Sequence, residues 1–195
     1  NQPYGDWDER MQALVYPPGH PYHHPTIGSM EDLSAASLDD VRDFFATWYA
    51  PNNAVLPVAG DFEAEAALDM IRRHFGHIPA NASLPAPPDM TIEPRIGAEV
   101  REVIPAAVPL PRIYLAHRIP PFGTDEFDAL DVAADILGSG RASRLYARLV
   151  REKRLAQDVS VFVFPIVGGA AMFSLWATAR PGVETEVLEA APLAE

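Results

Sequence analysis

The sequence predicts an α+β fold, in which antiparallel sheets carry helices packed on one face, and it predicts this arrangement twice along the chain. In the first half, a helical apolar pattern over residues 37–48 leads into a short apolar segment at 54–59. In the second half, two strand-like segments, 159–164 and 171–179, are joined by a short glycine-containing connection. Helices grouped beside antiparallel strands, rather than alternating with parallel ones, are typical of the α+β class.

The first half begins with a short helix and a lead-in rich in proline and histidine. Asp6 is placed to cap a helix that ends at Tyr16, and Trp7 and Met11 share one face of it. An extended segment follows over residues 19–28. Ser29 then begins a short acidic helical turn, and Ser37 is expected to cap a longer helix in which Asp39 and Asp40 face the positive end of the dipole.

This longer helix carries the broadest apolar face of the first half. Its large apolar side chains recur at three- and four-residue spacing, which predicts a face buried in a core: Val41, Phe44, Phe45 and Trp48. Residues 51–53 end the helix. The apolar segment 54–59 predicts a short buried strand, and Pro57 within it indicates an edge position or a bulge. Asp61 is placed to cap the next helix, which ends near Gly76.

Prolines mark the boundary between the two halves. Four of them lie between residues 81 and 94, in a run with few large apolar side chains, which favours extended and solvated backbone. We interpret this run as a linker, because domain boundaries favour such segments. A proline-rich strap lying across a single domain would have the same composition. The expected units are residues 1–88 and residues 89–195.

The second half is predicted to contain strands and helices around one hairpin. Gly138, Ser139 and Gly140 break the first helix of this half, and Ser143 is placed to cap the second. The expected strands are 98–103, 112–118, 159–164 and 171–179, and the expected helices are 125–137, 144–153 and 184–190.

Charge and composition exclude several functions. The formal charge of −12 and the pI of about 4.8 argue against nucleic acid and anionic membrane surfaces, since both require clustered Lys and Arg. The absence of cysteine excludes disulfides, Cys-ligated zinc and thiol nucleophiles. No apolar run is long enough to span a bilayer. Because the chain starts at Asn1 with no Met and no leader-like segment, we expect it to be a piece of a longer protein.

Three histidines in the lead-in are candidate metal ligands. His20, His23 and His24 are close in sequence, and imidazole is the commonest zinc ligand. However, His20 and His24 flank prolines, so no helix fixes their spacing, and no H-x-x-E-H pattern accompanies them. A packed loop is therefore favoured over a metal site.

Several ordered motifs give the chain a family resemblance. In chain order they are HPY, IGSMEDL, FFATWYAPNNAVLPVAGDF, HFGHIPA and ILGSGRASRLYARLVREKRLAQDVSVF. With these motifs the chain resembles the zinc peptidases of the pitrilysin/insulinase family, with the bacterial processing-peptidase-like branch as the nearest match. The resemblance implies two homologous units, both incomplete, with 1–88 as the rear part of a first peptidase-like domain and 89–195 as the front part of a second.

The resemblance also implies where the metal is bound. Members of the family hold zinc with an inverted His-x-x-Glu-His motif on a helix and a glutamate on a later helix, and the motif glutamate acts as general base. This chain contains no such motif, and the distal glutamate of relatives precedes the segment that begins at Asn1. We therefore expect zinc in the full-length protein, with no catalytic and no metal-binding residue in this fragment. The substrate-binding residues are unknown.

A second functional element of the family is an Arg and, seven residues on, a Tyr that steady the substrate carbonyl. Here those positions hold Val150 and Gln157. Arg151 and Arg154 are near but out of register, and they are interpreted as a solvated helix face. We therefore expect a homologous partner subunit without zinc to supply the Arg and Tyr in a heterodimer; a self-sufficient monomer or homodimer that uses other donors is the alternative. Three further residues match the family's GRxSRL motif and are assigned an architectural role: Arg141, Ser143 and Arg144.

Two functions remain as hypotheses. The first is a fragment of a zinc-dependent endopeptidase that cleaves peptides or unfolded segments, the fragment itself being inactive. The alternative is a non-catalytic structural or partner subunit with the same fold. A periplasmic or otherwise exported location is expected, and a cytoplasmic one is left open. Only the sequence before Asn1 can distinguish the two hypotheses directly, through the presence or absence of the zinc motif.

Overall fold

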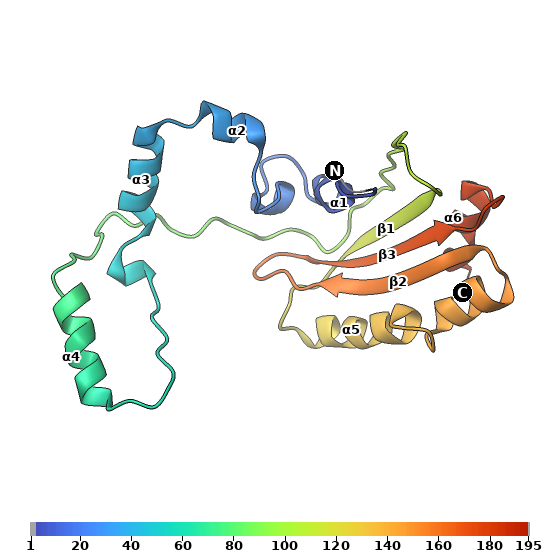
Figure 1. The fold of residues 1–195 in the computed structure, drawn as a ribbon. Helices are drawn as coiled ribbons and strands as arrows, with labels where there is room; N and C mark the ends of the chain where they lie inside the picture. Colours follow the sequence, from blue (N-terminus) through green and yellow to red (C-terminus); the bar gives the residue numbers. More distant parts are fainter. Residues whose placement is uncertain (1–2, 195) are drawn as a thin grey trace. The chain divides into compact units, whose positions relative to one another are not determined.

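The computed structural model describes residues 3–194 and divides them into two compact units (Figure 1). Unit 1 contains residues up to 26 and residues from 89 onward, and unit 2 contains residues 27–88. The elements of unit 1 are α1 (Trp7–Val15), η1 (Pro21–His23), β1 (Arg112–Ile119), α5 (Asp125–Gly138), η3 (Tyr146–Glu152), β2 (Ala156–Phe164), β3 (Ala171–Ala179) and α6 (Thr185–Leu193). Those of unit 2 are α2 (Met30–Ala35), α3 (Leu38–Trp48), η2 (Pro51–Asn53) and α4 (Ala64–Phe75).

An antiparallel sheet of three strands forms the centre of unit 1, in the order β1-β3-β2. Leu175 of β3 lies opposite Leu115 of β1 and Val161 of β2, so the middle strand pairs along both edges. β2 and β3 form the hairpin that the sequence predicts, and Gly168 in its turn has a φ of +76°. The α+β class and the antiparallel sheet are therefore confirmed.

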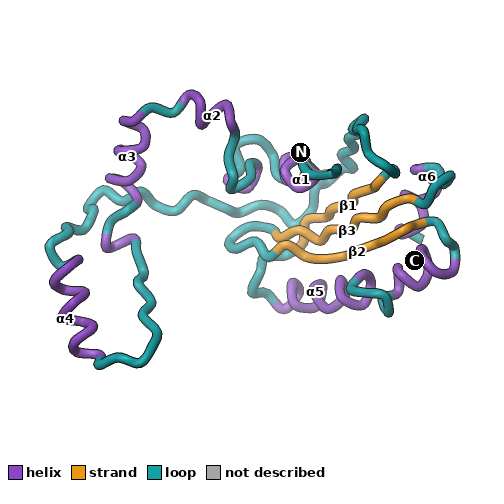
Figure 2. Tube along the Cα trace, in the orientation of Figure 1, coloured by secondary structure: helices purple, strands orange, loops and turns teal. Residues whose placement is uncertain are grey.

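Helices cover both faces of this sheet. α5 runs along one face (Figure 2), where the core contains Leu149 of η3 and Leu188 of α6, both fully buried. On the other face, Trp7 of α1 stacks on Tyr114 of β1 with ring centroids 5.0 Å apart, and Val15 and Tyr16 are buried against Met172. Alternation along β1 directs successive side chains to these two cores.

The start of the chain thus packs with its second half. Residues 3–26 belong to unit 1, together with residues 89–194, because α1 and the lead-in lie on the sheet. Unit 2 ends at residue 88, and residues up to 26 lie in unit 1, so these compact units are not 1–88 and 89–195. Whether 1–88 and 89–195 correspond to two homologous peptidase-like domains stays a prediction.

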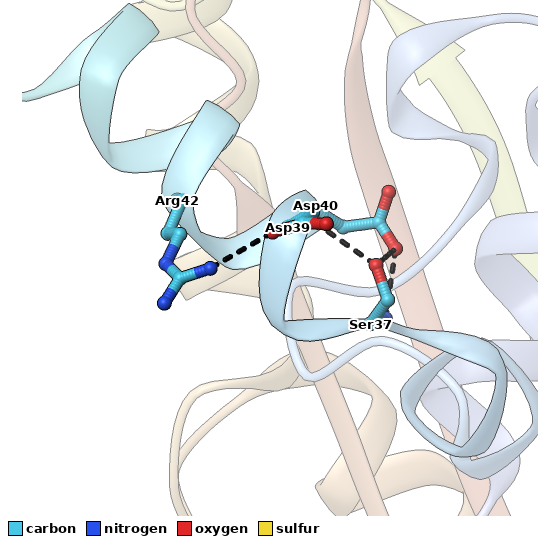
Figure 3. A network of polar contacts seen from close by, with 4 residues as sticks. All are labelled: Ser37, Asp39, Asp40 and Arg42. Carbon is cyan, nitrogen blue, oxygen red and sulfur yellow. Dashed lines mark hydrogen bonds and ion pairs between the residues drawn. The ribbon is translucent and has the colours of Figure 1, made fainter.

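The two serine caps predicted for unit 2, at the starts of α2 and α3, are present. Ser29 accepts a hydrogen bond from the Asp32 amide, and Ser37 and Asp40 form a reciprocal capping box (Figure 3). The Ser37 amide donates to the Asp40 carboxylate at 2.8 Å, and hydrogen bonds from Ser37 lower the pKa of Asp40. In the same turn, Arg42 pairs with Asp39 at 2.9 Å.

Several sequence predictions for unit 2 and for residues 98–103 of unit 1 are wrong. Residues 54–59 and 98–103 form no strand, because no other segment of the described chain pairs with them. α4 begins after Glu63 without a side-chain cap, so Asp61 does not cap it. The predicted core face of α3 is solvent-exposed, with Phe44 53% and Phe45 49% accessible.

The exposure of that face is general in unit 2. The structure describes all of residues 27–88, and among them Ala50 alone is buried. A helix with one apolar stripe needs a partner surface to cover it, and α3 and α4 have none within their own unit. The apolar pattern of α3 therefore agrees with the sequence, but no residue of its own unit covers that face.

Close packing in unit 1 can be tested at Gly138. A Cβ at this position would overlap the backbone nitrogen and side chain of Val161 in β2. We expect Gly138→Ala to lower the free energy of unfolding by about 1–3 kcal/mol, because overpacking outweighs the gain in helix propensity. Urea denaturation measures the change. Ser139→Ala, at the adjacent exposed position, is the control, and an equal effect of the two substitutions would contradict the packing argument.

Candidate functional site

The histidines of the lead-in are engaged in hydrogen bonds with backbone groups. His20 Nδ1 accepts from the Tyr22 amide at 3.1 Å, and His20 Nε2 lies 3.2 Å from the Met90 carbonyl oxygen. His23 Nδ1 lies 2.7 Å from the Tyr16 carbonyl oxygen. His24 contacts His23 ring edge to face. These contacts support the packed-loop interpretation of the HPYHH segment.

Within residues 3–194, no group of three or more His, Asp or Glu side chains could hold a metal ion. The three histidines of the lead-in do not converge with carboxylates, and His74, His77 and His117 lie on other segments. The location of the zinc expected for the full-length protein therefore stays a prediction.

Two tyrosines fasten the lead-in to the β2–β3 hairpin. The Tyr16 hydroxyl donates to the Ala170 carbonyl oxygen at 2.7 Å, and the Tyr22 hydroxyl donates to that of Val167 at 2.9 Å. Burial raises the pKa of Tyr16 to about 12, so this hydroxyl keeps its proton at neutral pH. Gly169 allows the close approach, since a Cβ there would lie 2.6 Å from the Met90 carbonyl oxygen.

Arg118 of β1 connects the same region to the sheet. Its Nε donates to the Val15 carbonyl oxygen at 2.7 Å, at the last residue of α1. One Nη donates to the carbonyl oxygens of Glu93 and Arg95 at 3.4 Å each. A cation near the carbonyl end of a helix is electrostatically favourable. Arg118 therefore binds both the end of α1 and the extended segment that contains Glu93 and Arg95.

Val150 and Gln157, which the family resemblance places at the Arg and Tyr positions, lie in the core and at the surface. Val150 is 5% exposed and packs in the main core, and its carbonyl oxygen accepts from Arg180 at 3.2 Å. Gln157 is exposed, at the register irregularity of β2. Arg151 and Arg154 are also exposed, in agreement with a solvated surface. Val150 thus offers no side-chain donor for a substrate carbonyl.

The GRxSRL segment has an architectural geometry that differs in detail from the prediction. Gly140 adopts a φ of +73°, as a tight turn requires. The Ser143 hydroxyl donates to the Gly140 carbonyl oxygen at 2.8 Å, so it closes the turn and does not cap a helix. The helix that follows is π-helical over Tyr146–Glu152 rather than α-helical. The sequence predicts a backbone contact of the Ser143 hydroxyl, but as the acceptor of a helix cap, whereas the hydroxyl is the donor.

An apolar cavity of about 180 Å³ lies on the α5 face of the sheet. Leu115, Val161 and Leu175 form its floor on the three strands, and Leu193 of α6 lies at its rim. His117, at the margin, is the titratable residue among its lining groups. A cavity with this lining can accept an apolar side chain, but it lacks a paired acid and base for hydrolysis.

Comparison with known proteins assigns the family. The family model described as "Peptidase M16 inactive domain" matches residues 35–192. The chain therefore belongs to the M16 peptidase family, which confirms the expectation from its motifs.

Individual relatives agree. The chain is 32% identical to the zinc protease PqqE of Helicobacter pylori over 188 residues, which cover 91% of this chain and 39% of the relative. It is 26% identical to an uncharacterised zinc protease of Mycobacterium leprae, over 87% of this chain and 38% of that protein. The chain thus spans about two fifths of the length of these relatives.

Solved structures share the fold. A protease from Helicobacter pylori superposes with a TM-score of 0.78 at 28% identity, covering 96% of this chain and 45% of that one. A peptidase M16 inactive domain from Pseudomonas fluorescens gives a TM-score of 0.67 at 22% identity, with the same coverage, and supports the fold alone. Among the helices that the structure describes, none has the length and apolarity needed to cross a membrane.

The attachment of the lead-in can be tested by removing one hydroxyl at a time. We expect Tyr16→Phe to lower the free energy of unfolding by about 1–3 kcal/mol, because the buried Ala170 carbonyl loses its donor. Tyr22→Phe removes a comparable hydrogen bond at an exposed site. This substitution should change the free energy of unfolding by less than about 0.5 kcal/mol. Urea denaturation of both variants is the measurement. Equal effects would show that the burial of Tyr16 does not determine its contribution.

Proposed function

We propose that the whole protein that contains this chain is a zinc-dependent endopeptidase that cleaves peptides or unfolded segments, and that its zinc is held outside residues 1–195. Membership of the M16 family supports the class, and several relatives are named zinc proteases. The chain corresponds to 39% of the PqqE relative, so more than half of that protein lies outside the match. On this proposal the fragment alone is inactive.

The observation that carries the proposal is the uncovered apolar surface of unit 2. Exposed apolar patches of this extent mark interaction surfaces rather than free solvent-facing surfaces. An apolar groove of about 300 Å³ runs between the 54–62 segment and α4. The large exposed apolar side chains of unit 2 include Leu33, Leu38, Val41, Phe44, Phe45, Trp48, Tyr49, Val55, Leu56, Val58, Phe62, Leu68 and Phe75.

On this proposal the zinc-bearing part of the whole protein covers that surface. Residues 54–59 then gain a neighbouring strand, and the apolar face of α3 becomes core. Residues 27–88 would in that case complete the first peptidase-like domain, as the family resemblance implies for 1–88. The proposal thus accounts for an apolar face that has no partner in its own unit.

The second part of the proposal concerns a partner subunit. Val150 is buried and apolar, so the substrate-steadying Arg and Tyr must come from elsewhere. A homologous subunit without zinc would supply them, and the two subunits would close on the peptide as a heterodimer. An exported, periplasmic location stays a prediction, which fractionation of the source cells would test.

One observation favours the alternative function. The matching family model describes an inactive domain, which fits a structural or partner subunit without its own zinc site. The two functions differ in the rest of the protein, where an intact His-x-x-Glu-His motif would support the peptidase and its loss the partner subunit.

Activity distinguishes these possibilities. We expect the 195-residue chain alone to cleave no peptide, and the full-length protein mixed with its homologue to show chelator-sensitive cleavage. The full-length protein alone should be slower by about a hundred- to a thousand-fold, since it lacks the oxyanion donors. A fluorogenic peptide assay with and without chelator is the measurement. Full activity of the protein alone, unchanged by the homologue, would contradict the heterodimer.

The covered surface gives an independent test. In the full-length protein, Phe45→Ala should lower the free energy of unfolding by about 3–5 kcal/mol, as expected for a large side chain in a core. Arg42→Ala, on the same helix and paired only with exposed Asp39, should change it by less than about 1 kcal/mol. Urea denaturation is the measurement. A loss below about 1 kcal/mol for Phe45→Ala would place this face at the surface of the whole protein.

A further inference from the structure

The segment between α5 and β2 concentrates positive charge in an otherwise acidic chain. Six of the fifteen Lys and Arg residues lie within residues 141–154, where Glu152 is the single acidic residue. The segment therefore has a formal charge of +5, and since the whole chain has −12, the remaining residues together have −17. We call the six cations the basic strip, and all of them are solvent-exposed: Arg141, Arg144, Arg148, Arg151, Lys153 and Arg154.

The backbone beneath the basic strip is fixed by the core. Leu145, Leu149 and Val150 are at most 5% exposed and pack in the main core of unit 1. At the end of η3, Arg180 donates to the carbonyl oxygens of Val150 and Ala156, at 3.2 and 3.1 Å. The positive side chains thus project from a backbone that is already ordered, which lowers the entropy lost when they bind a ligand.

Arg154 occupies a position at which glycine is the usual residue. It directly follows Lys153, the C-cap of η3, and its φ of +54° lies in the left-handed region. Helices commonly end on such a residue, and it is usually glycine because a Cβ is unfavourable there. Since the Arg154 side chain is exposed, it strains the backbone without filling a core. What the arginine adds is positive charge, and strain of this kind is found at functional sites.

We propose that the basic strip is a docking surface for an acidic, unfolded peptide segment of another protein. Five of its six cations are arginines, and the planar guanidinium group matches a carboxylate with two parallel hydrogen bonds. A short acidic segment can match the strip without reaching the acidic remainder of the chain. The docking surface does not depend on the proposed peptidase function.

Other anionic ligands fit the charge distribution less well. Nucleic acid and anionic membranes carry negative charge over distances much longer than a short peptide segment. Such a ligand would extend beyond the strip and meet the charge of −17 on the rest of the chain. The charge balance therefore favours a peptide over either of them.

Glu152 limits the positive charge of the strip. Its carboxylate pairs with Arg148 at 2.7 Å, and both side chains are about half exposed. An exposed ion pair of this kind contributes little to stability. A ligand carboxylate can therefore displace Glu152 from Arg148.

Fluorescence anisotropy with the full-length protein tests the docking surface. The probe is a fluorescein-labelled peptide of alternating Glu and Ala, and a chelator prevents its cleavage by a metal-dependent activity. We expect it to bind at least about tenfold more tightly than the same peptide with Gln in place of Glu. Because the contacts are exposed charges, raising the salt concentration about tenfold should also raise the Kd at least about tenfold.

Three substitutions separate charge from folding. Arg154→Gly removes a charge and relieves the strained backbone, so it should weaken binding about two- to fivefold while the urea midpoint stays the same or rises. Glu152→Gln should strengthen binding by a similar factor, since it frees Arg148. Arg95→Gln is the control. It removes an exposed charge of the same unit outside the strip, so the Kd should change by less than about 1.5-fold.

Equal affinity for the Glu and Gln peptides would overturn the docking surface, as would equal losses in Arg154→Gly and Arg95→Gln. A lower urea midpoint in Arg154→Gly would also overturn it, because the lost binding would then reflect damaged folding. Tighter binding of a single-stranded oligonucleotide or of phosphatidylglycerol vesicles than of the acidic peptide would assign the strip to that ligand and contradict the proposal.

Discussion

Coverage of the β1-β3-β2 sheet on both faces is the constraint on which unit 1 depends. On one face α5, η3 and α6 bury Leu149 and Leu188, and on the other α1 and the lead-in bury Val15 and Tyr16. A three-stranded sheet with one bare face would expose too much apolar surface to be stable alone. The association of residues 3–26 with a sheet formed nearly a hundred residues later follows from this requirement.

Unit 2 shows the opposite condition. Its helices have well-formed caps at Ser29 and Ser37, so their ends are specified locally. Their apolar faces are nevertheless exposed, and the 54–59 segment has no strand partner. Caps contribute about 1 kcal/mol each, whereas the burial of a side chain such as Phe45 contributes more, so capping cannot replace a core. The caps of unit 2 therefore fix the ends of its helices without supplying the burial that a core would give.

Local signals explain which features could be predicted from the sequence. The hairpin follows from two apolar segments around Gly168, and the Ser37 cap follows from a serine three residues before an aspartate. The burial of Phe44 and the strand at 54–59 were predicted from patterns that specify an apolar face but not the partner that covers it. The His20–Met90 and Arg118–Val15 contacts join residues far apart in sequence, and no local pattern indicates them. The hydrogen bonds of His20 are consistent with the packed loop expected from its place beside a proline.

The central claim is that the zinc-bearing part of the whole protein covers the apolar surface of unit 2. Because residues 1–195 contain no cysteine, a single thiol can report on this surface. Phe45→Cys and Arg42→Cys variants of the full-length protein would be labelled with a thiol reagent, and the rate at each position followed by peptide mass spectrometry. The account predicts slow labelling at position 45, rapid labelling at position 42, and equal rates in urea. Equally rapid labelling at both positions in the native protein would contradict it.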